Sequence, residues 1–252
     1  MNTWELPKEQ FIPLLYLIEI MRKHIPNIIT LFNLSSGCVA VLLATQGHLK
    51  EAAIMVLIAS VFDFFDGFVA RLLHVKSEMG KELDSLSDVV SFGVAPAVII
   101  YYLFIATGMS SVQLYDIWVI PACISVLFPC FVALRLAKFN TDSRQTEVFY
   151  GLPSPAAAFA LISFVFFEQN QYSFFIYTVV LVLLCVFMLA NIPLMSLKFK
   201  DFRFYNNVFR YILILAAVIL LVTLWFRAIL FIILTYVVLS LINNAIGVKR
   251  GK

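Results

Sequence analysis

Uninterrupted apolar segments, each about as long as a membrane is thick, dominate this sequence. Of its 252 residues, 62% are hydrophobic and 13% are charged, against roughly 45–50% and about 25% in a soluble domain. These values exclude a soluble globular protein, a disordered chain and a disulfide-built secreted domain. A helix needs about 20 apolar residues to cross a bilayer. We therefore predict an all-α integral membrane protein with about eight transmembrane helices. The apolar segments are residues 26–46, 50–73, 86–106, 117–137, 153–168, 173–196, 209–225 and 227–246.

The last two segments read at first as one. Val208 to Gly247 is 40 residues long, with Arg227 near its middle. That is twice the length of a normal span, and a charge at the centre of a bilayer is costly. Two spans joined by a tight turn near Trp225–Arg227 remove both problems.

Basic residues are distributed unevenly between the two ends of these segments. The net charge of +3 is too small to indicate a nucleic-acid partner. With a cytoplasmic N-terminus, only Lys50 and Arg227 of the 18 Lys and Arg residues lie on the outer side. Cytoplasmic loops of membrane proteins carry an excess of Lys and Arg. We therefore expect a multi-pass protein of the cell (inner) membrane with both termini in the cytoplasm.

Four aspartates make the region around the second and third spans specific. Asp63 and Asp66 are three residues apart, and Asp84 and Asp88 are four apart. Either spacing places the two side chains on one face of a helix. The first pair ends the second span and the second pair begins the third, with a short connection at 74–82. The four carboxylates should therefore converge at the inner edge of the bilayer.

Four unshielded carboxylates at a membrane edge would repel one another and lose hydration. A divalent metal relieves both penalties, and oxygen-only ligands favour Mg²⁺, Mn²⁺ or Ca²⁺ over zinc. Gly67 and Gly80 permit close approach of a ligand, and Arg71 suits phosphate. This set favours a metal–diphosphate site over helix caps and ion pairs. A divalent-cation transporter is the alternative from another class, but here the acidic residues stop at the inner edge.

The run from Asp63 to Asp88 reads D-x2-D-G-x2-A-R-x8-G-x3-D-x3-D. It resembles the signature of the CDP-alcohol phosphotransferases. The resemblance implies their bundle of transmembrane helices. It also implies two divalent ions, Mg²⁺ or Mn²⁺ with Ca²⁺ as an alternative, on the diphosphate of the CDP-linked donor. Asp63, Asp66 and Asp84 would bind metal, and Asp88 would be the general base and also touch metal. Gly67, Ala70, Arg71 and Gly80 would shape the nucleotide pocket, and Asp63 would also contact the CDP-linked donor.

Four further motifs resemble the membrane-integral phosphatidylserine synthases, the CDP-diacylglycerol–serine O-phosphatidyltransferases. They are IPNIITLFNLSSG at 25–37, DSLSDVVSFGVAP at 84–96, LRLAKFN at 134–140 and GLPSPAAA at 151–158. This resemblance implies a homodimer that transfers a phosphatidyl group from CDP-diacylglycerol to L-serine and releases CMP. Glycerol 3-phosphate or inositol phosphate as acceptor, and an archaeal ether lipid as donor, remain alternatives. Lys138 stands where the resembled pattern has arginine, so its role there is in doubt.

Substrate-contacting residues follow from these motifs. Pro26 can begin the first span, and Asn27 and Thr30 would then approach the cytidine. Asn33, one turn further into the membrane, would either hydrogen-bond another helix or reach the acceptor pocket. A cluster on the aspartate side, at the end of the fourth span, would hold the serine carboxylate, unless it is ordinary positive-inside flanking. Its members are Arg135, Lys138 and Asn140.

Three parts of the chain are expected. Residues 1–24 would form a cytoplasmic or interfacial segment, and residues 25–196 a catalytic transmembrane core of six helices. Residues 197–252 would add a helix pair and a short basic cytoplasmic tail. Because serine and the nucleotide are cytosolic, the active site should face the cytoplasm, in contact with membrane lipid.

Overall fold

The computed structural model describes residues 8–75, 77–107, 119–141, 149–170, 172–195 and 207–250. Outside them lie residues 1–7 of the predicted N-terminal segment and several basic residues of the predicted cytoplasmic side. These basic residues are Lys76, Arg144, Lys198, Lys200, Arg203 and Lys252. Within the described residues the protein is almost entirely helical, as its apolar composition predicts.

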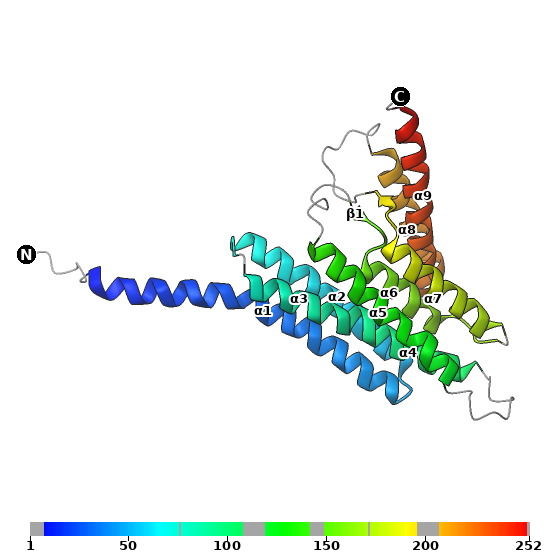
Figure 1. Ribbon diagram of the computed structural model, residues 1–252, viewed down its shortest axis with the longest axis horizontal. Coiled ribbons are helices and arrows are strands. Elements are labelled where there is room, and N and C mark those ends of the chain that lie inside the picture. Colours follow the sequence, from blue (N-terminus) through cyan, green and yellow to red (C-terminus); the bar gives the residue numbers. More distant parts are fainter. Residues whose placement is uncertain are drawn as a thin grey trace, which may run out of the picture.

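The first helix, α1 (Lys8–Thr45), is longer than predicted. Its first half projects away from the bundle, and its second half packs within it (Figure 1). The prediction that a helix begins at Pro26 is wrong, because α1 runs straight through this residue. A proline inside a helix leaves one carbonyl without its partner. That carbonyl belongs to Arg22, in a turn where Arg22 and His24 are exposed, so water can satisfy it.

Helix α2 (Leu49–Leu72) packs along α1. The contact is made by small side chains that are completely buried, which lets the two backbones approach closely. These side chains include Ala40, Ala44, Ala52, Ala53 and Val56. The end of α2, which carries Asp63 and Asp66, is thereby fixed next to the middle of α1.

The third span is an uninterrupted helix that consists of three consecutive segments. It consists of α3 (Glu78–Asp88), the π-helix η1 (Val89–Val94) and α4 (Ala95–Ala106). It begins earlier than the apolar segment at 86–106 because Ser77 caps it: the Gly80 N–H donates to Ser77 Oγ at 3.2 Å. Asp88 stands at the junction of α3 with the π-helix, a local irregularity that is frequent at functional sites.

Helix α5 (Val119–Thr141) completes the group around the aspartates. Next come α6 (Ser154–Ile162) with the 3₁₀ turn η3 (Ser163–Phe166), and then α7 (Ser173–Leu189). Short strands β1 (Phe149–Tyr150) and β2 (Pro193–Leu194) pair antiparallel beside them. Most of α6 is buried, which places it in the centre of the core.

The C-terminal segment is a helical hairpin, as predicted. Helices α8 (Val208–Leu224) and α9 (Ala228–Arg250) are joined by η5 (Trp225–Arg227). The hairpin runs at a steep angle to α1–α5 (Figure 1). Arg227 Nε donates to the Phe166 carbonyl at 2.7 Å, which ties the turn to the end of η3.

Five helical stretches of the described residues are long and apolar enough to cross a membrane. Two shorter apolar helices cover Ser154–Phe166 and Ser173–Leu189. The fifth stretch, Val208–Ala245, contains the hairpin turn. The fold is thus that of an all-α membrane protein, and the total of eight spans stays a prediction.

Candidate active site

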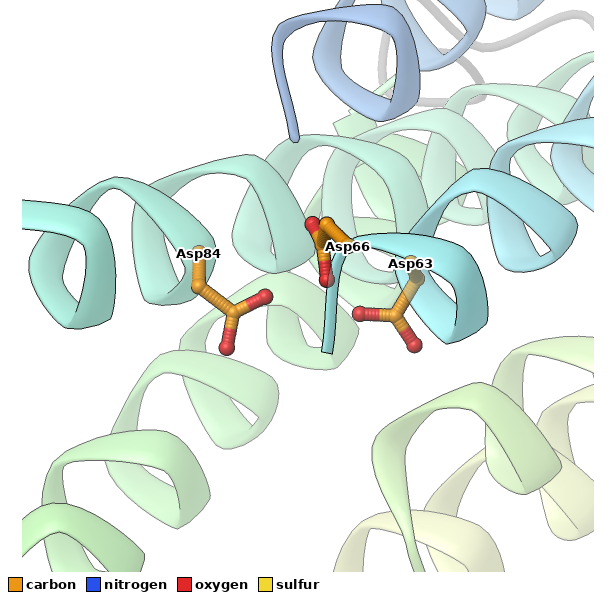
Figure 2. Close-up of side chains that lie close together, drawn as sticks. All are labelled: Asp63, Asp66 and Asp84. Carbon is orange, nitrogen blue, oxygen red and sulfur yellow. The ribbon is translucent and has the colours of Figure 1, made fainter. Parts of the chain in front are cut away.

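Three aspartates converge where the ends of α2 and α3 meet. Asp63 and Asp66 come from α2, and Asp84 from α3. One carboxylate oxygen from each lies within 4.8 Å of the others. Their carboxyl groups turn toward one shared space (Figure 2). Three of the four carboxylates predicted to converge therefore do so, and the three-residue spacing of Asp63 and Asp66 places that pair on one side of α2.

The fourth aspartate, Asp88, lies one turn deeper. It is 8% exposed, and the side chain of Asp63 contacts both Asp84 and Asp88. Asn33 Nδ2 donates to Asp88 Oδ1 at 3.4 Å. Carboxylates in direct contact repel one another unless a cation or a proton lies between them. The cluster therefore favours binding of a cation or retention of a proton.

Helix α1 forms one wall of the cluster through hydroxyl groups. The Thr30 hydroxyl donates to Asp66 Oδ2 at 2.6 Å. Ser87 Oγ donates to the Thr30 carbonyl at 3.2 Å, and Ser91 Oγ to the Asn33 carbonyl at 3.0 Å. These bonds attach the third span to α1 at the depth of the aspartates. Sequence reasoning missed both serines, although their four-residue spacing places them on one helix face.

A close approach at Gly37 makes this attachment possible. A Cβ atom on Gly37 would lie 2.8 Å from Ser91 Cα, closer than real Cβ contacts come. The absence of a side chain at Gly37 lets the π-helix lie directly against α1. Gly37 thus helps to set the separation between the two walls of the site.

Next to the aspartates is a cleft of about 470 Å³. Ligand pockets are typically about 300–1,000 Å³, so it has room for a small molecule. Its lining includes residues predicted for the donor or for metal, together with others that were not predicted. Those predicted for the donor are Asn27, Thr30, Gly67, Ala70 and Gly80, and those predicted for metal are Asp66 and Asp84. The additional ones are Pro26, Val75, Ser77, Glu78 and Lys81.

Two glycines shape this cleft differently. A Cβ atom on Gly80 would lie 2.9 Å from Asn27 Oδ1, so Gly80 gives the Asn27 amide its place. A Cβ atom on Gly67 would lie 3.4 Å from Arg71 Nη1, an ordinary contact. Arg71 itself is exposed and is not among the lining residues of the cleft.

The three residues predicted at the end of α5 have separate partners. Arg135 Nη1 donates to Ser154 Oγ at 2.7 Å, and its charge acts on Asp88. Lys138 Nζ donates to Asn191 Oδ1 at 2.7 Å and to the Leu189 carbonyl at 3.2 Å. The structure therefore brings Arg135 to the aspartates and directs Lys138 toward the end of α7.

Asn140 connects α5 to α3. Its Nδ2 donates to Ser85 Oγ at 2.8 Å, and Lys81 Nζ donates to its backbone carbonyl at 3.3 Å. Ser85 follows Asp84 directly, so this bridge holds the helix that carries the third aspartate. The sequence signal for these partners is weak, because Ser85 and Lys81 are separated from Asn140 by more than fifty residues.

Three buried polar atoms around the site have no hydrogen-bond partner in the described part of the chain. They are Asn33 Oδ1, Asp84 Oδ1 and Arg135 Nε. Leaving a buried polar group unsatisfied costs about 1–3 kcal/mol, which indicates that this region is built to hold something else. The Asp84 oxygen, in a set of carboxylate oxygens, fits a hard divalent cation.

The fold and the carboxylate cluster together define a class: a membrane-embedded helical protein with an acidic site that can hold divalent metal at the end of its spans. Comparison with known families is more specific. The CDP-alcohol phosphatidyltransferase family matches residues 23–190, and the chain belongs to this family. The family depends on divalent metal, and the triad Asp63, Asp66 and Asp84 can bind such an ion.

Several curated proteins are similar to this chain. A CDP-diacylglycerol–serine O-phosphatidyltransferase of Mycobacterium leprae is 37% identical over 145 residues, 55% of this chain and 45% of that protein. An archaetidylserine synthase of Methanothermobacter thermautotrophicus is 38% identical over 145 residues, which are 56% of this chain and 57% of that protein. A CDP-diacylglycerol–serine O-phosphatidyltransferase of Helicobacter pylori is 34% identical over 181 residues, which are 69% of this chain and 72% of that protein. The match thus spans about half the length of the first two relatives.

Proposed function

We propose that this protein is a CDP-diacylglycerol–serine O-phosphatidyltransferase. It would transfer the phosphatidyl group of CDP-diacylglycerol to L-serine, giving phosphatidylserine and CMP. The observation that carries this proposal is the cluster of four aspartates beside a cleft of about 470 Å³. The names of the relatives in Mycobacterium leprae and Helicobacter pylori support serine as the acceptor.

The donor would bind with its nucleotide in the cleft and its acyl chains in the lipid. Asn27 and Thr30 on one wall, and Gly67, Ala70 and Gly80 on the other, would contact the CDP portion. Their place in the lining supports these roles. Arg71, exposed beside Gly67, would meet phosphate oxygens at the mouth of the cleft.

Asp63, Asp66, Asp84 and Asp88 would hold two divalent ions, Mg²⁺ or Mn²⁺, with Ca²⁺ as the alternative. When bound, these ions would neutralise the diphosphate and the departing CMP. The protein's own acid–base chemistry would be the work of Asp88. Its carboxylate would take the proton from the serine hydroxyl. The serine oxygen would then form a bond to the phosphorus nearest the lipid, and the bond from that phosphorus to the CMP oxygen would break.

The orientation proposed for the protein agrees with this chemistry. The site would face the cytoplasm, where serine and CMP are soluble, and both termini would lie on that side of the inner membrane. The excess of Lys and Arg at that end of the spans supports this orientation. A homodimer is proposed as the functional unit, on the resemblance to the family alone.

A second candidate differs in the donor lipid. The archaetidylserine synthase relative favours an ether lipid linked to CDP as an alternative. The aspartates and the acceptor pocket would act in the same way, because the hydrocarbon chains lie away from the reacting phosphorus.

The test is CMP release by purified protein, with CDP-diacylglycerol or its CDP-linked ether-lipid counterpart as donor. Serine, glycerol 3-phosphate and inositol phosphate are offered separately, with Mg²⁺, with Mn²⁺, or with a chelator. We expect metal-dependent release with serine. Release with another acceptor alone would refute serine while retaining the class of reaction. Absence of release with every acceptor and donor, in folded protein, would refute the proposed activity.

A further inference from the structure

We propose that helix α9 is a positioning element of the active site and not only part of a C-terminal anchor. Three of its polar side chains would hold the strand pair β1–β2 in place, and with it the start of α6. The family match covers residues 23–190, and α9 lies beyond it in the chain. This inference rests on the proposed function for its effect on turnover.

Helix α9 carries a row of polar side chains on a mostly apolar surface. Tyr236, Ser240 and Asn244 follow one another at four-residue intervals, which places them on one face of the helix. Ser240 is completely buried, and its Oγ accepts from the Met195 N–H at 3.2 Å. The Tyr236 hydroxyl donates to the Met195 carbonyl at 3.0 Å, and Asn244 Nδ2 donates to the Pro193 carbonyl. All three side chains therefore bind backbone atoms of one short segment.

That segment follows α7 and is not helical. In a membrane protein, non-helical backbone is tolerated where the protein itself satisfies its polar groups. The segment contains β2, which lies next to α9 (Figure 1) and pairs with β1. Just after β1, the Gly151 N–H donates to the Ile192 carbonyl at 3.0 Å. Helix α9 thus holds one strand, and strand pairing extends the constraint to the chain that enters α6.

The turn between β1 and α6 fits tightly against the same part of the chain. Gly151 has a φ of 78°, and a Cβ atom on it would lie 2.4 Å from the Met188 carbonyl oxygen. The next N–H, that of Leu152, donates to the Phe187 carbonyl at 3.0 Å. A shift of β2 would therefore be transmitted to this turn, because the turn has no free space into which it can relax.

Ser154, at the start of α6, connects this turn to the catalytic aspartates. It is completely buried, and its Oγ accepts from Arg135 Nη1 at 2.7 Å. The charge of Arg135 acts in turn on Asp88, the proposed base. A displaced turn would move Ser154 and with it the guanidinium beside Asp88. The polar row on α9 would thus act on the reaction through Arg135, without touching the reacting groups.

The donor cleft provides an internal control for this route. Its lining residues all belong to α1, α2, α3 or the connection between α2 and α3. Helix α9 instead packs against α8, α6, β2 and the turns η3 and η5. A disturbance that passes through β2 and α6 should therefore slow turnover and leave the KM for the donor unchanged. General damage to the fold would change both.

The test removes single hydroxyl groups from α9 in the full-length protein. Ser240→Ala and Tyr236→Phe each delete one bond to Met195. Thr235→Val is the matched control, because the Thr235 hydroxyl donates to the Phe231 carbonyl of its own helix at 2.7 Å. Three quantities are measured: kcat/KM for serine, KM for CDP-diacylglycerol and the unfolding midpoint. Backbone amide exchange, followed by mass spectrometry over residues 149–154, reports on the turn independently of activity.

Each of the two variants should lower kcat/KM for serine by about two- to tenfold, the effect expected of one lost hydrogen bond. The donor KM should stay unchanged, and amide exchange should rise at 149–154 but not at 27–37 in α1. Combined with Arg135→Lys, Ser240→Ala should have little further effect, because substitutions that act through one contact are not additive. Thr235→Val should behave as the wild type.

The proposal and the proposed function fail differently. Unchanged exchange at 149–154 in both variants would refute the hold of α9 on the turn, whatever the activity. Raised exchange with unchanged kcat/KM for serine, or with an equal effect on the donor KM, would refute the positioning role and leave the proposed function standing. If the wild type releases no CMP with serine, the proposed function is refuted, and the role of α9 in turnover with it.

Discussion

Replacing Gly80 by alanine should separate stability from donor binding. The new Cβ atom would lie 2.9 Å from Asn27 Oδ1, whereas ordinary contacts begin at 3.4 Å. The Asn27 amide would therefore retreat by about 0.5 Å from its place in the cleft lining. Losing one hydrogen bond of the Asn27 amide to the donor costs about 0.5–1.5 kcal/mol. The KM for CDP-diacylglycerol should accordingly rise by a factor of about two to ten.

The same substitution should not weaken the fold. Gly80 lies in the first turn of α3, and alanine in a helix is more stable than glycine by about 0.5–1 kcal/mol. We expect an unfolding midpoint in detergent that is unchanged or higher. Glu82→Ala is the matched control, because Glu82 is exposed on the same helix and does not line the cleft.

The assay measures CMP release against donor concentration at saturating serine, together with thermal unfolding of the same preparations. A Gly80→Ala variant with unchanged or lower donor KM would refute the assignment of this cleft to the donor. If the donor KM rises equally in Gly80→Ala and Glu82→Ala, the effect comes from a general disturbance of α3 and not from displacement of the Asn27 amide.

Three further substitutions test the site. Asp88→Asn should retain donor binding, measured with a fluorescent CDP-lipid, and lose turnover; normal turnover would show that another group is the base. Asp63→Asn should weaken metal-dependent nucleotide binding in titration calorimetry, and unchanged metal dependence would exclude it as a ligand. Asn140→Leu, which removes the bond to Ser85, should lower the free energy of unfolding by about 1 kcal/mol and slow all acceptors equally; an acceptor-dependent effect would instead place Asn140 in the pocket.

The aspartate cluster could be predicted from sequence because its geometry is local. A three- or four-residue spacing fixes a shared helix face, and a short connection between α2 and α3 brings the two faces together. The hairpin at Trp225–Arg227 was predictable for a similar reason, since bilayer thickness limits the length of one span. In both cases the prediction depends only on spacings along one helix or between two consecutive helices.

Contacts between distant helices could not be predicted in the same way. The LRLAKFN motif placed Lys138 with the acceptor, which stays a prediction, but it gave no sign that the Lys138 ammonium donates to Asn191 Oδ1 and to the Leu189 carbonyl. The side chains of Ser87 and Ser91 became meaningful only once α1 lay beside the third span. Pro26 was read as a helix start, although a proline with an exposed preceding turn can lie inside a helix.

The most direct test of the proposed reaction follows one atom. Purified protein is incubated with CDP-diacylglycerol, a divalent metal and serine that carries a heavy oxygen isotope in its hydroxyl group. The masses of both products are then measured by mass spectrometry. Attack of the serine oxygen on phosphorus predicts that the heavy oxygen appears in phosphatidylserine and that CMP carries none. Phosphatidylserine without the heavy oxygen, or CMP formed with no phosphatidylserine, would contradict the account.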